Sequence, residues 1–133
     1  MGGYLGVFVP DHEGNVYVLP SPRISLLDNP PEKQNIIYKI DSQTGKMSEY
    51  LNLPSAQPPS AENPFGALAL TYDCDTNSLY VSTVMGSTRG QELGRIYRVD
   101  LNTGKVATQY DNVDEFGVAT YNLLTGKRLY FGS

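Results

Sequence analysis

Residues 37–46 read IYKIDSQTGK, and residues 96–105 read IYRVDLNTGK. The two segments are identical at six of ten positions, and the Lys/Arg and Ile/Val exchanges keep the chemistry of the side chain. Each segment alternates apolar and polar residues and then runs into Asp-x-x-Thr-Gly-Lys. That composition is typical of a tight turn, because Asp bonds to nearby backbone and Gly tolerates a positive φ. Each copy therefore predicts a hairpin, with its second strand over 47–53 or 106–112.

A second unit occurs three times, as an apolar residue and Gly, a strand, a polar turn and a short strand that contains Tyr. Its copies are residues 5–18, 65–82 and 116–132. The units alternate along the chain, so the sequence predicts four antiparallel strands, four more, and then two. Ten Tyr, 13 Gly and nine Pro also favour an all-β protein over a helical one.

Four short antiparallel strands per repeat are typical of a β-propeller blade. The repeated sequences resemble blades of the propeller group that includes YVTN-type, NHL-type and gluconolactonase-like proteins. The resemblance implies one domain over 1–133, with blades at about 4–53 and 65–112 and a half-blade at about 116–133. A sandwich of ten strands is the competing architecture, but a sandwich has no reason to repeat one hairpin sequence.

Closed propellers contain about four to eight blades. Two and a half blades leave apolar blade faces uncovered, since each blade buries its faces against its neighbours. We therefore expect a partial propeller, completed by self-association or by the remainder of a larger propeller.

The net charge and the cysteine content limit the classes of partner and the cellular compartment that we expect. The net charge is −4 and the basic residues are scattered, which argues against nucleic acid as a partner. No apolar run approaches the roughly 20 residues that cross a bilayer, so we expect no membrane span. Cys74 is the only cysteine and the N-terminus lacks the features of a secretory signal, which favours the cytoplasm.

In a propeller, short turns lie on one face and the connections between the second and third strands, and between blades, lie on the other. The long connections here are residues 20–35, 54–64 and 83–95. Long connections in a compact domain are often functional. We therefore predict a binding or interaction module that uses this long-connection face, for a small-molecule or protein ligand that the sequence leaves unspecified.

The resemblance also implies an alternative, a metal-dependent hydrolase of the lactonase kind or a piece of one. Gluconolactonase-like proteins hold a divalent metal near the axis with Glu, Asn and Asp side chains, and oxygen ligands of this type suit a cation such as Ca²⁺. Asn63, Asp114 and Glu115 are the candidates by position, since they precede the first strand of a blade. Solvated turn residues are the plainer interpretation, so we favour a binding module, or a structural unit without activity, over an enzyme.

Overall fold

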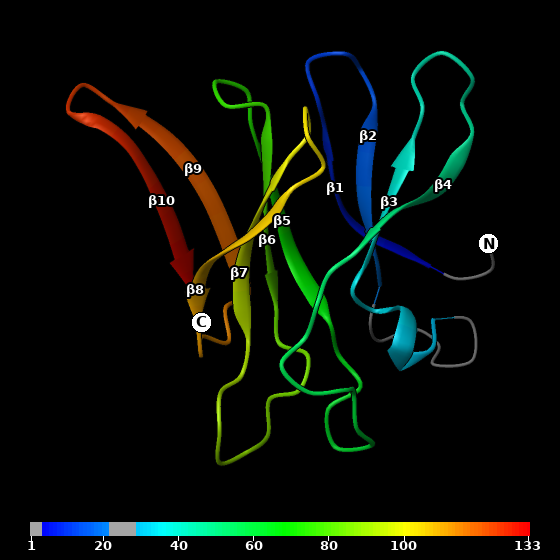
Figure 1. Cartoon of the computed structure of the whole chain (residues 1–133), viewed down its shortest axis with the longest axis vertical. Helices are drawn as coiled ribbons and strands as arrows, with labels where there is room; N and C mark the ends of the chain where they lie inside the picture. Colours follow the sequence, from blue (N-terminus) through cyan, green and yellow to red (C-terminus); the bar gives the residue numbers. More distant parts are fainter. Residues whose placement is uncertain (1–3, 22–28) are drawn as a thin grey trace.

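The computed structural model describes residues 4–21 and 29–133, which form an all-β chain of three antiparallel sheets (Figure 1). The first sheet contains β1 (Leu5–Pro10), β2 (Val16–Pro20), β3 (Ile36–Ile40) and β4 (Met47–Asn52). The second contains β5 (Ala67–Asp73), β6 (Ser78–Thr83), β7 (Arg95–Asp100) and β8 (Val106–Asp111). The third contains β9 (Gly117–Leu123) and β10 (Gly126–Gly132), and a 3-10 turn, η1, covers Pro31–Lys33.

Each sheet is a meander in which neighbours in sequence are neighbours in space. This confirms the predicted all-β class and its antiparallel four-stranded meanders, and no closed barrel forms among the described residues. The two repeated hairpins are β3–β4 and β7–β8. Their turns have the predicted chemistry, because Gly45 and Gly104 have φ values of 66° and 70°. Asp41 and Asp100 each accept hydrogen bonds from two backbone N–H groups of their own turn.

The short hairpin turns lie at one end of the sheets and the long connections lie at the other (Figure 1). This confirms the prediction that the long connections share one end. Of the connection predicted over 20–35, residues 22–28 lie outside the described part of the chain.

The main core lies between the first and second sheets. In β2 and β3, every second side chain points toward the second sheet, because successive side chains of a strand point to opposite faces. They pack against the central strands β6 and β7, where Leu79, Val81 and Val99 are fully buried. A smaller cluster of Val18, Ile36 and Tyr38 lies on the opposite face of the first sheet.

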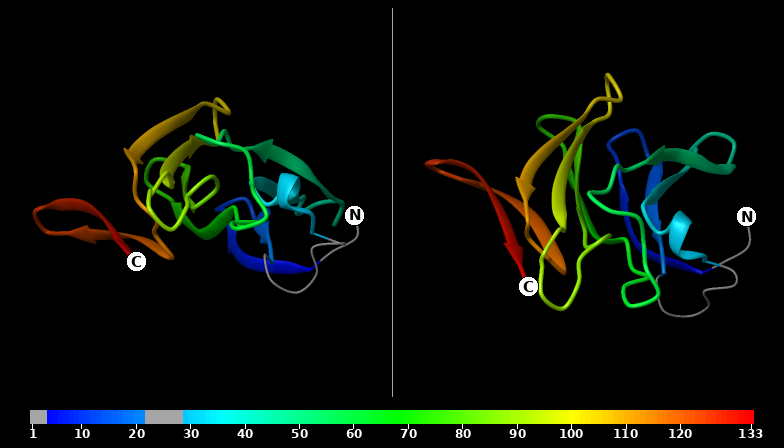
Figure 2. Two further views of the ribbon diagram at one scale, coloured as in Figure 1. Left: turned by 90° about the horizontal axis from the view of Figure 1, so that it is seen from below. Right: turned by 60° about the horizontal axis from the view of Figure 1, so that its bottom comes forward.

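The three sheets lie side by side, with their first strands β1, β5 and β9 along one side of the row (Figure 2). β1 contacts β5, and β5 contacts β9. The connections that lead into these first strands therefore come together at the long-connection end. In the described part of the chain, no helix is long and apolar enough to cross a membrane.

Candidate binding site

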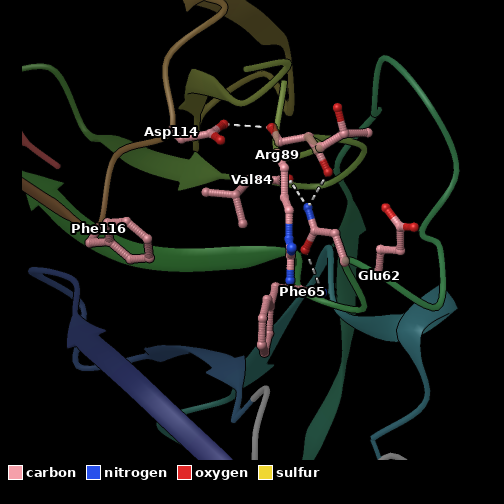
Figure 3. A pocket seen from close by; sticks show the side chains of 9 residues that line it. Glu62, Phe65, Val84, Arg89, Asp114 and Phe116 are labelled. Atoms are coloured by element: carbon pink, nitrogen blue, oxygen red, sulfur yellow. Dashed lines mark hydrogen bonds between the residues drawn. The ribbon is translucent and has the colours of Figure 1, made fainter. Parts of the chain in front are cut away.

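A hollow of about 590 Å³ lies at the long-connection end (Figure 3). Its walls come from three segments, namely the β4–β5, β6–β7 and β8–β9 connections. The residues that line it are Glu62, Asn63, Phe65, Val84, Ser87, Thr88, Arg89, Asp114 and Phe116.

Asn63 holds the first of these connections against the second. Its side-chain amide donates hydrogen bonds to the carbonyl oxygens of Val84, at 2.8 Å, and Ser87, at 2.9 Å. Its Oδ1 accepts from the backbone N–H of Phe65 at 3.1 Å. The Asn63 side chain thus fixes the shape of the wall, and its oxygen is already engaged by backbone.

Ser87 and Asp114 hold the second connection against the third. The Ser87 hydroxyl donates to Asp114 Oδ1 at 2.5 Å, and the backbone N–H of Gly94 donates to the same oxygen at 3.0 Å. The Ser87 oxygen also accepts from the backbone N–H of Leu93 at 2.9 Å. A Cβ on Gly94 would lie 2.3 Å from the carbonyl oxygen of Val113, so only glycine permits this close approach.

The chemical groups inside the hollow are mixed. Phe65, Val84 and Phe116 supply apolar surface, and the Phe116 side chain is 65% exposed. Arg89 runs across the hollow, with Phe116 and Glu62 on opposite sides of it (Figure 3). Arg89 is exposed and makes no ion pair with any residue that the structure describes.

The three residues predicted as metal ligands do not converge. Asn63 and Asp114 both line the hollow and both contact Ser87. Glu115 is only 9% exposed, lies outside the lining, and has an Oε2 without a hydrogen-bond partner among the described residues. Within the described ranges, 4–21 and 29–133, no three His, Cys, Asp or Glu side chains come close enough to hold a metal ion.

Sequence reasoning did not identify Ser87, Arg89 or Val84 as site residues. Residues 86–90 read GSTRG, which predicts a mobile loop tip and nothing more. Ser87 is instead buried, and it bonds to a residue 27 positions away. No local sequence signal marks a contact of that span.

The opposite end of the molecule holds the only histidine and the only cysteine. His12, in the β1–β2 turn, hydrogen-bonds through Nδ1 to the Tyr72 hydroxyl at 2.7 Å, and that hydroxyl donates to Asn77 Oδ1 at 2.9 Å. The Cys74 thiol, in the β5–β6 turn, contacts its neighbour Asp75. The hollow, at the other end of the sheets, therefore contains no histidine.

A scan against protein-family models, a search of curated proteins and a search of solved structures each return no match.

Proposed function

We propose that this chain is a propeller-type binding module and that its ligand binds in the hollow at the long-connection end. The observation that carries the proposal is that mutually braced connections surround the exposed side chains of Arg89 and Phe116. Three connections are fixed to one another by the hydrogen bonds of Asn63, Ser87 and Asp114. Arg89 and Phe116, which are both exposed, lie between these connections, where a ligand would contact them. A preformed hollow with apolar walls and a few polar groups is the usual form of a small-molecule site.

The arrangement of the sheets supports the propeller part of the proposal. In a propeller the first strand of each blade lines the central channel, and here β1 contacts β5 and β5 contacts β9 across sheets. A closed ring has about four to eight blades, so the complete assembly would include sheets in addition to these three.

Titration with phenylacetate and with phenethylamine tests the proposed site, because both probes carry a ring for Phe116 and their opposite charges distinguish Arg89 from Glu62 as the polar contact. We expect at least one probe to shift the backbone NMR signals of residues 62–65, 84–89 and 114–116. Phe116→Ala is expected to weaken that binding, and Tyr121→Ala, which removes another exposed ring away from the hollow, is the matched control. Shifts that are absent, or that persist unchanged in Phe116→Ala, would contradict the proposal.

The alternative of a metal-dependent hydrolase receives less support from the geometry, because the Asn63 oxygen is engaged by backbone and Glu115 lies outside the hollow. Calcium and manganese titrations separate the two functions. A binding module shows no rise in melting temperature with either ion, whereas a metal site raises it in proportion to the logarithm of the ion concentration.

A further inference from the structure

The lining of the hollow carries charges of both signs. Arg89 supplies a cation, and Glu62 and Asp114 supply carboxylates. None of the three takes part in an ion pair within residues 4–21 and 29–133. A ligand with a single charge is attracted by one sign and repelled by the other, whereas a ligand with both charges can be attracted by both.

The Asp114 carboxylate is held in a fixed position in the wall. Its Oδ1 accepts hydrogen bonds from the Ser87 hydroxyl at 2.5 Å and from the backbone N–H of Gly94 at 3.0 Å, and its Oδ2 accepts none from the described residues. A positioned acceptor loses little side-chain entropy when it binds a ligand, so Asp114 is suited to an ammonium group. Glu62 is exposed, and fixing its longer side chain costs more entropy.

The Arg89 guanidinium lies apart from Asp114. In Figure 3 the Arg89 side chain extends away from Asp114 and toward Phe65, which separates its nitrogen atoms from the Asp114 carboxylate. A guanidinium is planar and presents paired N–H donors, a geometry that matches a carboxylate. The two charged groups can therefore bind different ends of one ligand.

Apolar surface accompanies these charged groups. Val84 and Phe116 lie on the same side of Arg89 as Asp114 does (Figure 3), and the Phe116 ring is exposed. An aromatic ring of a ligand can stack on Phe116. The hollow, at about 590 Å³, lies within the range of about 300–1,000 Å³ that is usual for small-molecule sites.

We propose that the ligand is a small zwitterion with an aromatic side chain. Asp114 binds its ammonium group, Arg89 binds its carboxylate and Phe116 contacts its ring. A free aromatic amino acid and a short peptide both have this chemistry. The inference rests on the proposed function, since it specifies the ligand of the same hollow, and it adds that recognition needs both charges.

NMR titrations with four probes test this inference. Phenylalanine carries both charges, phenethylamine lacks the carboxylate, and 3-phenylpropanoate lacks the ammonium group. Glycylphenylalanine carries both charges farther apart. We expect the better of the two zwitterions to bind with a Kd at least about tenfold below that of either singly charged probe, because each charge-assisted hydrogen bond adds affinity. The tighter zwitterion then identifies the source, an amino acid or a peptide.

Two variants that each remove one charge assign the charged groups. Asp114→Asn keeps an oxygen for the Gly94 N–H, and it should weaken zwitterion binding about tenfold and leave 3-phenylpropanoate no weaker. Arg89→Gln should weaken the zwitterion by a similar factor and leave phenethylamine no weaker. Glu62→Gln removes the same charge as Asp114→Asn from the same lining, so it is the matched control and should change the Kd by less than about twofold. An unchanged amide signal of Gly94 confirms that the wall of each variant is folded.

The outcomes separate this inference from the function on which it rests. If a singly charged probe binds in the hollow as tightly as both zwitterions, the ligand class is wrong and the hollow is still a binding site. If Asp114→Asn and Glu62→Gln weaken the zwitterion equally, the role of Asp114 is wrong. If no probe shifts the signals of residues 62–65, 84–89 and 114–116, the proposed function is contradicted together with the ligand class.

Discussion

The β5–β6 hairpin and the β9–β10 hairpin follow the same sequence pattern and end in different environments. Both begin with Phe-Gly and both carry Leu-Tyr in the second strand. In the first hairpin Leu79 and Val81 are fully buried, whereas Phe131, the counterpart of Val81, is 38% exposed. The difference shows that these strand sequences determine the hairpin, while burial depends on the third and fourth strands and on the neighbouring sheet.

The interface between the first and second sheets also differs from the interface between the second and third sheets in how much apolar surface it buries. The first and second sheets share an apolar core that buries side chains from both. No residue of the third sheet belongs to this core, and its contacts with the second sheet include polar groups and a ring pair. Lys127 forms ion pairs with Asp73 and, at 2.9 Å, with Asp75, which also accepts a hydrogen bond from the Asn122 amide at 2.8 Å. The Tyr110 and Phe131 rings lie 4.8 Å apart.

Truncation of Leu79 and of its counterpart Leu129 should give the largest difference in the free energy of unfolding. Leu79→Ala leaves a cavity in a fully buried site and should lower the free energy of unfolding by about 2–5 kcal/mol. Leu129→Ala, at a partly exposed site, should lower it by about 1 kcal/mol. Urea unfolding followed by circular dichroism measures both. Equal losses would mean that the third sheet is packed as well as the second.

Replacement by Ala of Gly66, which precedes β5, and of Gly117, the first residue of β9, should give the next largest difference in stability. A Cβ on Gly66 would lie 2.5 Å from the backbone carbonyl of Gln34, so Gly66→Ala forces the β2–β3 connection to move and should cost about 1–3 kcal/mol. Gly117 has nothing within 4 Å of that position, so Gly117→Ala should change stability by less than about 0.5 kcal/mol. Thermal unfolding of the two variants checks the prediction. A tolerated Gly66→Ala would contradict the close packing of these connections.

Lys127→Met should loosen the third sheet from the second. The Asp73 carboxylate is 3% exposed, and loss of its cation leaves a buried charge, which costs about 1–3 kcal/mol. Lys105→Met is the matched control, because that exposed lysine lies in the β7–β8 turn and forms no ion pair with any residue in the described ranges. Tryptic cleavage after Arg128, compared between the variants, reports on the docking of the hairpin.

The same contact should make docking sensitive to acid. Burial raises the pKa of Asp73, but hydrogen bonds from Lys127, Thr76 and the backbone N–H of Asp75 outweigh it, so the pKa lies below the ordinary value of 3.8. A carboxyl group with a lowered pKa stabilises the folded state above its ordinary pKa, and this stabilisation is lost as the pH falls through the lowered value. Unfolding between pH 6 and pH 2 should therefore show a loss of stability that is smaller in Lys127→Met. An identical pH profile in the two proteins would contradict the role of this ion pair.

The ring contact between Tyr110 and Phe131 should have the smallest effect. Both rings are partly exposed, and a double-mutant cycle with Tyr110→Ala and Phe131→Ala should give a coupling free energy of about 0.5–1.5 kcal/mol. A coupling of zero would assign the docking of the hairpin to the polar contacts alone.

Repetition in the sequence explains why the fold could be predicted in such detail. Local patterns that occur twice in the sequence predict the hairpins at 37–46 and 96–105 and their glycine turns. The same patterns predict the grouping of the long connections. The contacts that build the hollow and dock the third sheet span 27 and 54 residues, as Ser87 with Asp114 and Lys127 with Asp73 do. Such contacts depend on how sheets pack, which no local pattern records. Position along the chain therefore drew attention to Asn63 and Asp114, which line the hollow, and to Glu115, which does not, and it missed Ser87 and Arg89.

Hydrogen exchange at equivalent amides of β6 and β10 tests the central comparison most directly. If burial comes from the added strands and not from the shared hairpin sequence, the amides of Leu79, Tyr80 and Val81 should exchange only through global unfolding. Those of Leu129, Tyr130 and Phe131 should then exchange faster, through local opening of the third sheet. Equal protection of the two strands in the isolated protein would contradict this account.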